Sequence, residues 1–272
     1  MHYGLIEMID CRRKFYCYSR RILLLAMLSL LGACAINPAK QVMPLEQGLD
    51  IYRTEKASAP TVLLVPGCGG LVANGSAAFF PRIAKKLNDN GFNAIVLDYV
   101  RIMGQDNACL NQIKFEKVVA LINAALAYTA AQPYVDREHI ALLGWSLGGS
   151  GVLTVADKIA ANDQPDITAV AAYYPGCYSG LHLSFHPTLL LSGLADNVVD
   201  ANACIALAKQ SPQTPLVLKT YEGAQHCFDV EEFKKPQSTR FLWKKFTVAY
   251  DEAAADDAER TLLQFLEKYN RF

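Results

Sequence analysis

Ser146 lies at the centre of the segment GWSLGG, residues 144–149, which contains a Gly-x-Ser-x-Gly pattern. Such a serine can attack a carbonyl carbon when a sharp turn between a strand and a helix lifts its hydroxyl out of the sheet. The flanking glycines allow the turn to close, and the free N–H groups at the start of the helix favour negative charge. A chance match in an ordinary turn is the alternative. The apolar run before the motif and the helical pattern after it favour a nucleophile elbow.

A serine hydroxyl also needs a base that removes its proton, and His226 is the best candidate. In chains with this motif, the catalytic order is serine, then Asp or Glu, then His, and His226 follows the apolar run 216–218 late in the chain. His139, His182 and His186 precede apolar runs instead, which predicts that they lie at the opposite edge of a sheet. A structural role is the alternative for His226, but its position favours a general base.

Asp196 is the predicted acid, because it follows the apolar run 189–191 in the segment LSGLAD. That position predicts a loop at the same edge of the sheet as Ser146 and His226. Asp98, at the end of an earlier run, and Asp200, which could instead cap a helix, remain rivals.

An oxyanion hole needs two backbone N–H groups that point at the developing charge. The N–H of Leu147, directly after the serine, is the first candidate. The second is the N–H of Cys68 in the glycine-rich segment PGCGGL, residues 66–71. A plain tight turn is the alternative for that segment.

The elements that must position these residues alternate between two patterns. Short continuous apolar runs predict strands buried on both faces, and stretches of helical period separate most of them. We therefore expect an α/β fold, with a mostly parallel sheet flanked by helices on both faces. The predicted strands are residues 62–65, 94–97, 140–143, 169–174, 189–191 and 216–218, and the predicted helices are 79–87, 115–128, 147–159, 201–209 and 253–269.

Composition and spacing exclude several classes of function. The 26 Lys and Arg residues balance 26 Asp and Glu residues, so there is no electrostatic signature of nucleic-acid binding. The segment after the first run has Val72 where a dinucleotide-binding fingerprint needs a third glycine, and no P-loop lysine follows. The cysteines form no zinc-binding spacing, so we expect no zinc site.

The first 33 residues resemble a bacterial lipoprotein signal peptide. A basic stretch precedes the apolar residues 22–31, which are fewer than the roughly 20 that a membrane-spanning helix needs. This stretch ends in Leu31-Gly32-Ala33-Cys34, where Cys34 would be lipidated and become the mature N-terminus. Residues 34–47 are predicted to be a tether and 48–272 the folded domain. The predicted location is the cell envelope, facing the periplasm, and an ordinary signal peptide with secretion is the alternative.

Together, five segments resemble the dienelactone hydrolase family of α/β-hydrolases. They are PGCGGL at 66–71, GWSLGG at 144–149, YYPGC at 173–177, LSGLAD at 191–196 and YEGAQHCF at 221–228, and the resemblance covers about residues 60–270. It implies a Ser146, Asp196 and His226 triad, hydrolysis of esters or lactones, and no metal or organic cofactor. Ser146 stands where the founding members of the family carry cysteine.

The cysteines after Cys34 are Cys68, Cys109, Cys177, Cys204 and Cys227. Because export would place them in an oxidising compartment, we expect pairing. Cys68 and Cys109 follow strands expected to be neighbours, and Cys177 and Cys204 lie in successive loops at one edge of the sheet. This predicts the disulfides 68–109 and 177–204 with Cys227 free, and buried free thiols are the alternative.

The sequence thus predicts an exported serine hydrolase that cleaves a small ester, lactone or thioester through an acyl-enzyme. An acyltransferase or peptidase would use the same residues, and a non-catalytic envelope lipoprotein could keep the fold. The expected partners are a small-molecule substrate and, through Cys34, a membrane, with no nucleic acid. The oligomeric state, monomer or higher, is left open.

Overall fold

The computed structural model describes residues 43–71, 77–109, 113–159, 166–183, 185–211, 215–241 and 244–270. The predicted signal peptide, Cys34 and the tether up to residue 42 lie outside the described residues. In the described part of the chain, no helix is both long and apolar enough to span a membrane.

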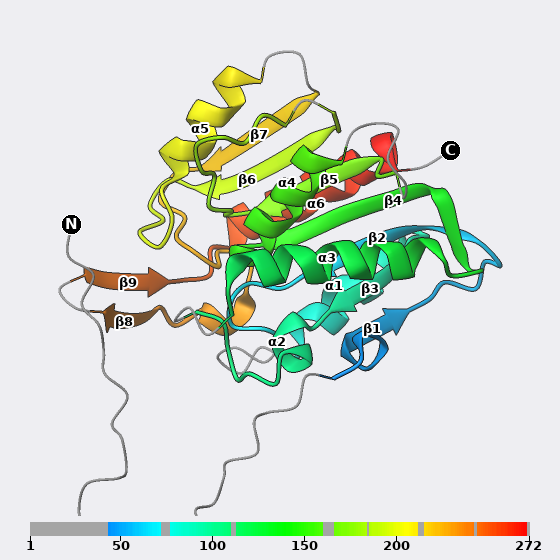
Figure 1. Ribbon diagram of the computed structural model, residues 1–272. Coiled ribbons are helices and arrows are strands. Elements are labelled where there is room, and N and C mark those ends of the chain that lie inside the picture. Colours follow the sequence, from blue (N-terminus) through cyan, green and yellow to red (C-terminus); the bar gives the residue numbers. More distant parts are fainter. Residues whose placement is uncertain are drawn as a thin grey trace, which may run out of the picture. The chain divides into compact units, whose positions relative to one another are not determined.

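A seven-stranded sheet forms the centre of the domain, in the order β1-β3-β2-β4-β5-β6-β7 (Figure 1). All neighbouring strands are parallel except β1, which pairs antiparallel with β3. The mostly parallel sheet predicted from the apolar runs is confirmed. The strands are β1 (Leu49–Tyr52), β2 (Ala59–Val65), β3 (Asn93–Leu97), β4 (Val135–Trp145), β5 (Ala169–Tyr173), β6 (Thr188–Gly193) and β7 (Leu216–Tyr221).

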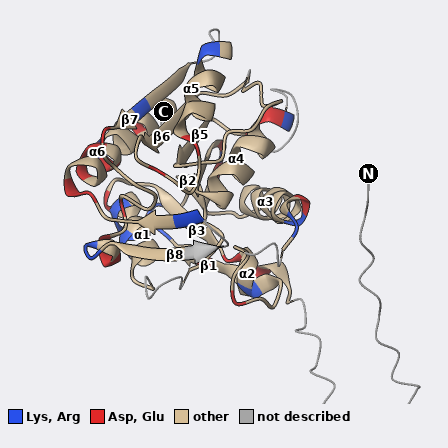
Figure 2. Ribbon diagram, turned by 90° about the vertical axis from the view of Figure 1, so that its left-hand side faces the viewer, with Lys and Arg blue, Asp and Glu red and all other residues tan. Residues whose placement is uncertain are grey.

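Helices cover both faces of this sheet, as predicted. On one face, Leu63 and Val65 of β2 belong to the core formed with α3 (Phe115–Ala130), α4 (Leu147–Lys158) and α5 (Ala201–Gln210). On the other face, Val62 and Leu64 belong to the core formed with α1 (Phe79–Asp89) and α6 (Glu252–Tyr269). Figure 2 shows charged residues on the outer helices α3 and α6, while β2 and β5 carry none. Burial on both faces explains why these strands read as continuous apolar runs.

Two strand regions and three short helices were not predicted. β1 lies at the edge of the sheet, and β8 (Gln237–Phe241) pairs antiparallel with β9 (Lys244–Val248) as a separate hairpin. Edge strands and hairpins carry polar residues, so they lack the apolar runs that identified the central strands. The α2 helix (Tyr99–Ile102) follows β3, and a 3-10 helix, η3 (Glu231–Phe233), precedes the hairpin.

The end of the predicted tether belongs to the folded domain. The N–H of Met43 donates to the carbonyl oxygen of Ile102 at 3.0 Å, and a 3-10 helix, η1, spans Leu45–Gly48. Met43 and Leu45 also pack against the core. The folded domain therefore includes residues 43–47, which the sequence analysis had assigned to the tether.

Candidate active site

Ser146 occupies a strained turn between β4 and α4. Its backbone φ is 50° and ψ is −117°, a conformation that residues other than glycine rarely adopt. Close packing enforces the turn, because a Cβ added at Gly144 would lie 2.5 Å from the carbonyl oxygen of Gly148. A Cβ added at Gly148 would lie 2.2 Å from the carbonyl oxygen of Pro66. These contacts explain the two glycines of the motif and are typical of a nucleophile elbow.

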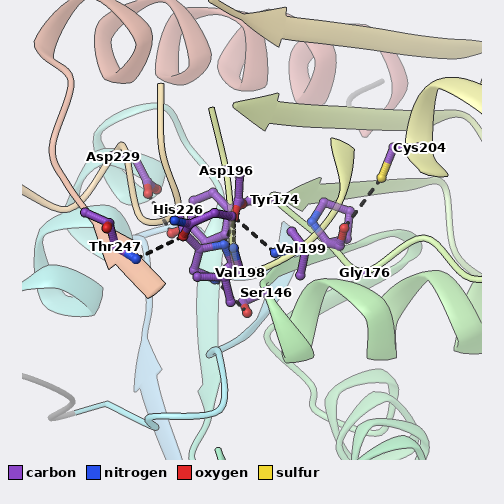
Figure 3. Close-up of polar contacts among 12 residues, drawn as sticks. Ser146, Tyr174, Gly176, Asp196, Val198, Val199, Cys204, His226, Asp229 and Thr247 are labelled. Carbon is purple, nitrogen blue, oxygen red and sulfur yellow. Dashed lines mark hydrogen bonds and ion pairs between the residues drawn. The ribbon is translucent and has the colours of Figure 1, made fainter. Parts of the chain in front are cut away.

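Three side chains from three loops form a continuous chain of hydrogen bonds (Figure 3). The Nε2 atom of His226 lies 2.9 Å from Ser146 Oγ, and its Nδ1 atom lies 2.6 Å from Asp196 Oδ2. With the ring proton on Nδ1, His226 donates to Asp196 and accepts from the Ser146 hydroxyl. This arrangement can remove the serine proton and stabilise the resulting imidazolium.

Asp196 is itself held by the backbone. Its second oxygen, Oδ1, accepts hydrogen bonds from the N–H of Val198 at 2.7 Å and of Val199 at 3.1 Å (Figure 3). The side chains of Asp196 and His226 are almost entirely buried, with 1% and 6% exposed. The carboxylate is therefore fixed in orientation toward the imidazole, with little water to compete for it.

The loops that carry Asp196 and His226 are hydrogen-bonded to each other. Asp196 follows β6 and His226 follows β7, which are neighbouring parallel strands. The N–H of Ala195 donates to the carbonyl oxygen of Ala224 at 3.0 Å. A Cβ at Gly193 would lie 2.3 Å from that same oxygen, so only glycine fits between these loops.

Cys68 and Leu147, the predicted oxyanion residues, line one cavity with Ser146. Among the described residues, no acceptor is found for the backbone N–H of either one. The loop that carries Cys68 is fixed by the hydroxyl of Tyr99, which donates to the carbonyl oxygen of Gly67 at 2.7 Å. The two N–H groups are therefore available to a ligand next to Ser146.

The cavity has a volume of about 330 Å³. Apolar and small polar residues line it, and none of them carries a formal charge. The lining residues are Cys68, Ala108, Cys109, Ile113, Phe115, Ser146, Leu147, Ser150, Gly176 and Val199. Within the described parts of the chain, no group of three or more His, Cys, Asp or Glu could hold a metal ion.

Both predicted disulfides are present, one between Cys68 and Cys109 and the other between Cys177 and Cys204. Cys227 is free, also as predicted. Burial raises the pKa of the Cys227 thiol well above its ordinary value, so the thiol stays protonated at neutral pH. The first disulfide connects the loop after β2 to the loop before α3, at the wall of the cavity.

A family model for dienelactone hydrolases matches residues 49–270. The chain belongs to the dienelactone hydrolase family. A dienelactone hydrolase-like promiscuous phosphotriesterase from metagenomic libraries has a similar solved structure, with a TM-score of 0.64 and 19% identity, covering 81% of this chain and 92% of that one. Esterase 2 of Thermogutta terrifontis, phosphorylated by paraoxon, gives a TM-score of 0.59 at 20% identity and covers 81% and 88% of the two chains. No curated protein sequence matches this chain.

Family membership supports hydrolase activity, and the solved structures share the α/β-hydrolase fold. In the present chain, the two other candidates for the acid, Asp98 and Asp200, have different roles. Asp98 caps α2 by accepting from the N–H of Arg101 at 2.9 Å, and Asp200 caps α5 by accepting from the N–H of Asn202 at 2.9 Å. His186 bonds the carbonyl oxygen of Ile159 and His139 bonds Asp136, both away from Ser146.

The sequence analysis missed Asp229, a buried carboxylate three residues after His226. Its two oxygens accept from Trp145 Nε1 at 2.8 Å and from the Tyr174 hydroxyl at 2.7 Å. Burial raises the pKa of Asp229 from its ordinary value of 3.8 to about 6, although these two hydrogen bonds favour the ionised form. In the sequence, only its position three residues after His226 pointed to Asp229. Its two donors, Trp145 and Tyr174, lie far away along the chain, so no local pattern connects them to it.

Proposed function

We propose that this protein is a serine hydrolase that cleaves a carboxylic ester, lactone or thioester of a small substrate. The observation that carries the proposal is the hydrogen-bonded chain of Ser146, His226 and Asp196, with distances of 2.9 and 2.6 Å, at the wall of a cavity. Phosphorylation of the related esterase 2 by paraoxon is consistent with a reactive group in this fold.

In the proposed mechanism, Ser146 Oγ attacks the acyl carbon while His226 Nε2 takes its proton. Asp196 stabilises the imidazolium that forms, since it already accepts from Nδ1. The N–H groups of Cys68 and Leu147 would bind the oxyanion of the tetrahedral intermediate. The imidazolium then protonates the leaving group, and water repeats the sequence to release the acid from Ser146.

The cavity favours an uncharged substrate with a small apolar acyl group. None of the described residues that line the cavity carries a charge that could pair with a substrate carboxylate, and burying an unpaired carboxylate is costly. The segments that follow Leu71 and Cys109, residues 72–76 and 110–112, also contain no charged residue. We therefore infer a neutral ester as the substrate, in preference to a carboxylate-bearing lactone.

The test compares two esters that differ by one charge, p-nitrophenyl butyrate and the p-nitrophenyl monoester of succinate. We expect turnover of the butyrate ester, at least about 10-fold lower kcat/KM for the succinate ester, and no turnover of either by Ser146→Ala. A fluorophosphonate probe should label the wild-type chain on Ser146 and leave Ser146→Ala unlabelled. A wild-type chain that is neither labelled nor active would instead favour a non-catalytic module, and an active Ser146→Ala would overturn the mechanism.

We also propose that the protein is exported and anchored by a lipid on Cys34, facing the periplasm. The support is the Leu-Gly-Ala-Cys sequence after an apolar stretch, together with two disulfides that suit an oxidising compartment. Radiolabelled palmitate fed to bacteria expressing the full chain should label the wild type and not Cys34→Ala. Wild-type protein found without label in the soluble fraction would exclude the anchor.

A further inference from the structure

Asp229 joins three parts of the active site through one buried carboxylate. It lies on the loop that carries His226, and Figure 3 shows it beside His226 and Tyr174. Its Oδ2 accepts from the indole N–H of Trp145 and its Oδ1 from the hydroxyl of Tyr174. Each donor comes from the end of a different strand, Trp145 from β4 and Tyr174 directly after β5.

Both donors adjoin residues of the proposed mechanism. Trp145 directly precedes Ser146 in the chain. The ring centroid of Tyr174 lies 4.5 Å from that of His226, so the phenol packs against the imidazole. Tyr174 has a φ of 37°, an unfavourable conformation for a residue with a side chain. The backbone of Tyr174 is strained, and its hydroxyl donates to the buried carboxylate of Asp229. Together these two features indicate a fixed position for the ring.

We propose that Asp229 is a positioning residue that fixes Trp145 and Tyr174 and, through them, the nucleophile Ser146 and the base His226. This proposal rests on the function proposed above. The arrangement is costly to the fold, since the carboxylate is buried away from water, and the hydrogen bonds from Trp145 and Tyr174 offset part of that cost. A buried apolar residue of similar size would fill the space but would hold neither donor.

The charge of Asp229 also acts on His226. A protonated His226 favours the ionised form of Asp229, and by reciprocity ionised Asp229 favours the imidazolium that forms when Ser146 loses its proton. The other titratable groups that face this cluster are Tyr173 at the end of β5, Tyr174 directly after it, Cys227 on the same loop as Asp229, and Asp196 on the far side of His226. Burial keeps both tyrosines and the thiol neutral at neutral pH, so among these described groups the carboxylates of Asp229 and Asp196 are the ones that can place a negative charge beside His226.

The test measures kcat, KM and the pH profile of p-nitrophenyl butyrate hydrolysis by the full chain and two variants. Asp229→Asn keeps the size of the side chain but cannot accept from both donors as a carboxylate does. We expect kcat to fall about 10- to 100-fold, because small displacements of reacting groups cost that much. KM should stay within about threefold, since Asp229 does not line the cavity. The acidic limb of the kcat/KM profile should move to lower pH, because the imidazolium loses a nearby negative charge.

Tyr174→Phe keeps the ring on His226 and removes only the hydroxyl donor, so a smaller fall in kcat, about 3- to 10-fold, is expected. Tyr221→Phe is the matched control. Tyr221 is also a tyrosine whose hydroxyl bonds an aspartate, Asp257 at 3.2 Å, but the other partners of Asp257 are Lys219 and Arg260 and not Ser146 or His226. Its kcat and pH profile should equal those of the wild type.

An Asp229→Asn variant with wild-type kcat and an unmoved pH profile would overturn the positioning role. If that variant does not unfold cooperatively, Tyr174→Phe decides the question, and unchanged kcat in that variant overturns the role. Ser146→Ala separates this inference from the proposed function. If Ser146→Ala keeps its activity, the proposed function fails, whereas an inactive Ser146→Ala beside a fully active Asp229→Asn refutes the positioning role alone.

Discussion

The backbone N–H of Ser146 donates a hydrogen bond to the carbonyl oxygen of Tyr173 at 2.9 Å. Tyr173 ends β5, and its register partner on β4 is Trp145, the residue before the serine. Ser146 is therefore held by the neighbouring strand through a backbone contact that does not depend on its own side chain. This contact offsets part of the strain of a φ of 50° at Ser146.

Gly148→Ala should disrupt the elbow. The new Cβ would lie 2.2 Å from the carbonyl oxygen of Pro66 and 2.3 Å from that of Val65, so the backbone must move. We expect a loss of about 1–3 kcal/mol in the free energy of unfolding, measured in urea, together with a lower kcat. Gly149→Ala is the matched control, because its nearest new contacts are 3.2 Å long and need only a small adjustment. Equal effects of the two changes would contradict this account of the turn.

Asp196→Asn should lower kcat by a factor on the order of 10³ to 10⁴. The side-chain oxygen of the asparagine can still accept from the N–H groups of Val198 and Val199. Its NH2 group then faces the imidazole and cannot accept the hydrogen bond from His226. Asp200→Asn tests the rival acid with the same chemical change. Because asparagine caps helices as well as aspartate does, kcat and the free energy of unfolding should stay at wild-type values. A large loss of kcat only in Asp200→Asn would reverse the assignment.

The pH dependence of stability should report the buried Asp229. Because burial raises its pKa from 3.8 to about 6, the folded chain binds this proton more tightly than the unfolded chain. The stabilisation that the proton on Asp229 gives to the folded chain is fully present below pH 3.8 and is lost as the pH rises through 6. Asp229→Asn lacks this loss, so its stability relative to the wild type should rise by about 2 kcal/mol between about pH 4.5 and pH 7.

Urea unfolding at several pH values measures that rise, with Asp257→Asn as the control. The Lys219 ammonium bonds Asp257 and lowers its pKa to about 2, so Asp257 is ionised in both the folded and unfolded chain over most of this range. The stability difference between Asp257→Asn and the wild type should hardly change with pH. A flat pH dependence for Asp229→Asn as well would mean that Asp229 titrates normally.

The two disulfides should differ in their effect on catalysis. They close loops with sequence separations of 41 and 27 residues, so loss of either should lower the free energy of unfolding by roughly 4 kcal/mol in the chain-entropy model. Only the pair Cys68→Ser and Cys109→Ser should also lower kcat, because Cys68 carries a proposed oxyanion N–H. The pair Cys177→Ser and Cys204→Ser should keep kcat below its unfolding transition. A greater loss of kcat in the second pair would place the oxyanion contact elsewhere.

The central strands and the residues at their ends could be predicted because they obey local rules. Strands buried on both faces must be apolar along their whole length, and a nucleophile elbow requires glycines at fixed offsets from Ser146. Asp196 and His226 follow from the rule that loops at the carboxyl ends of parallel strands meet at one edge. The antiparallel β1 and the β8–β9 hairpin follow no such rule, since their exposed positions accept polar and apolar residues alike.

The sequence by itself therefore determined the α/β class, and it gave Ser146, His226 and Asp196 and the two cysteine pairs as the leading candidates. Each of these depends on residue type and on position along the chain. Only the tertiary structure assigned Asp98 and Asp200 to helix caps and placed Asp229 between Trp145 and Tyr174, residues 84 and 55 positions away in the chain. The physical reason is that a buried carboxylate is stable only where distant donors converge on it, and their convergence is a property of the folded sheet.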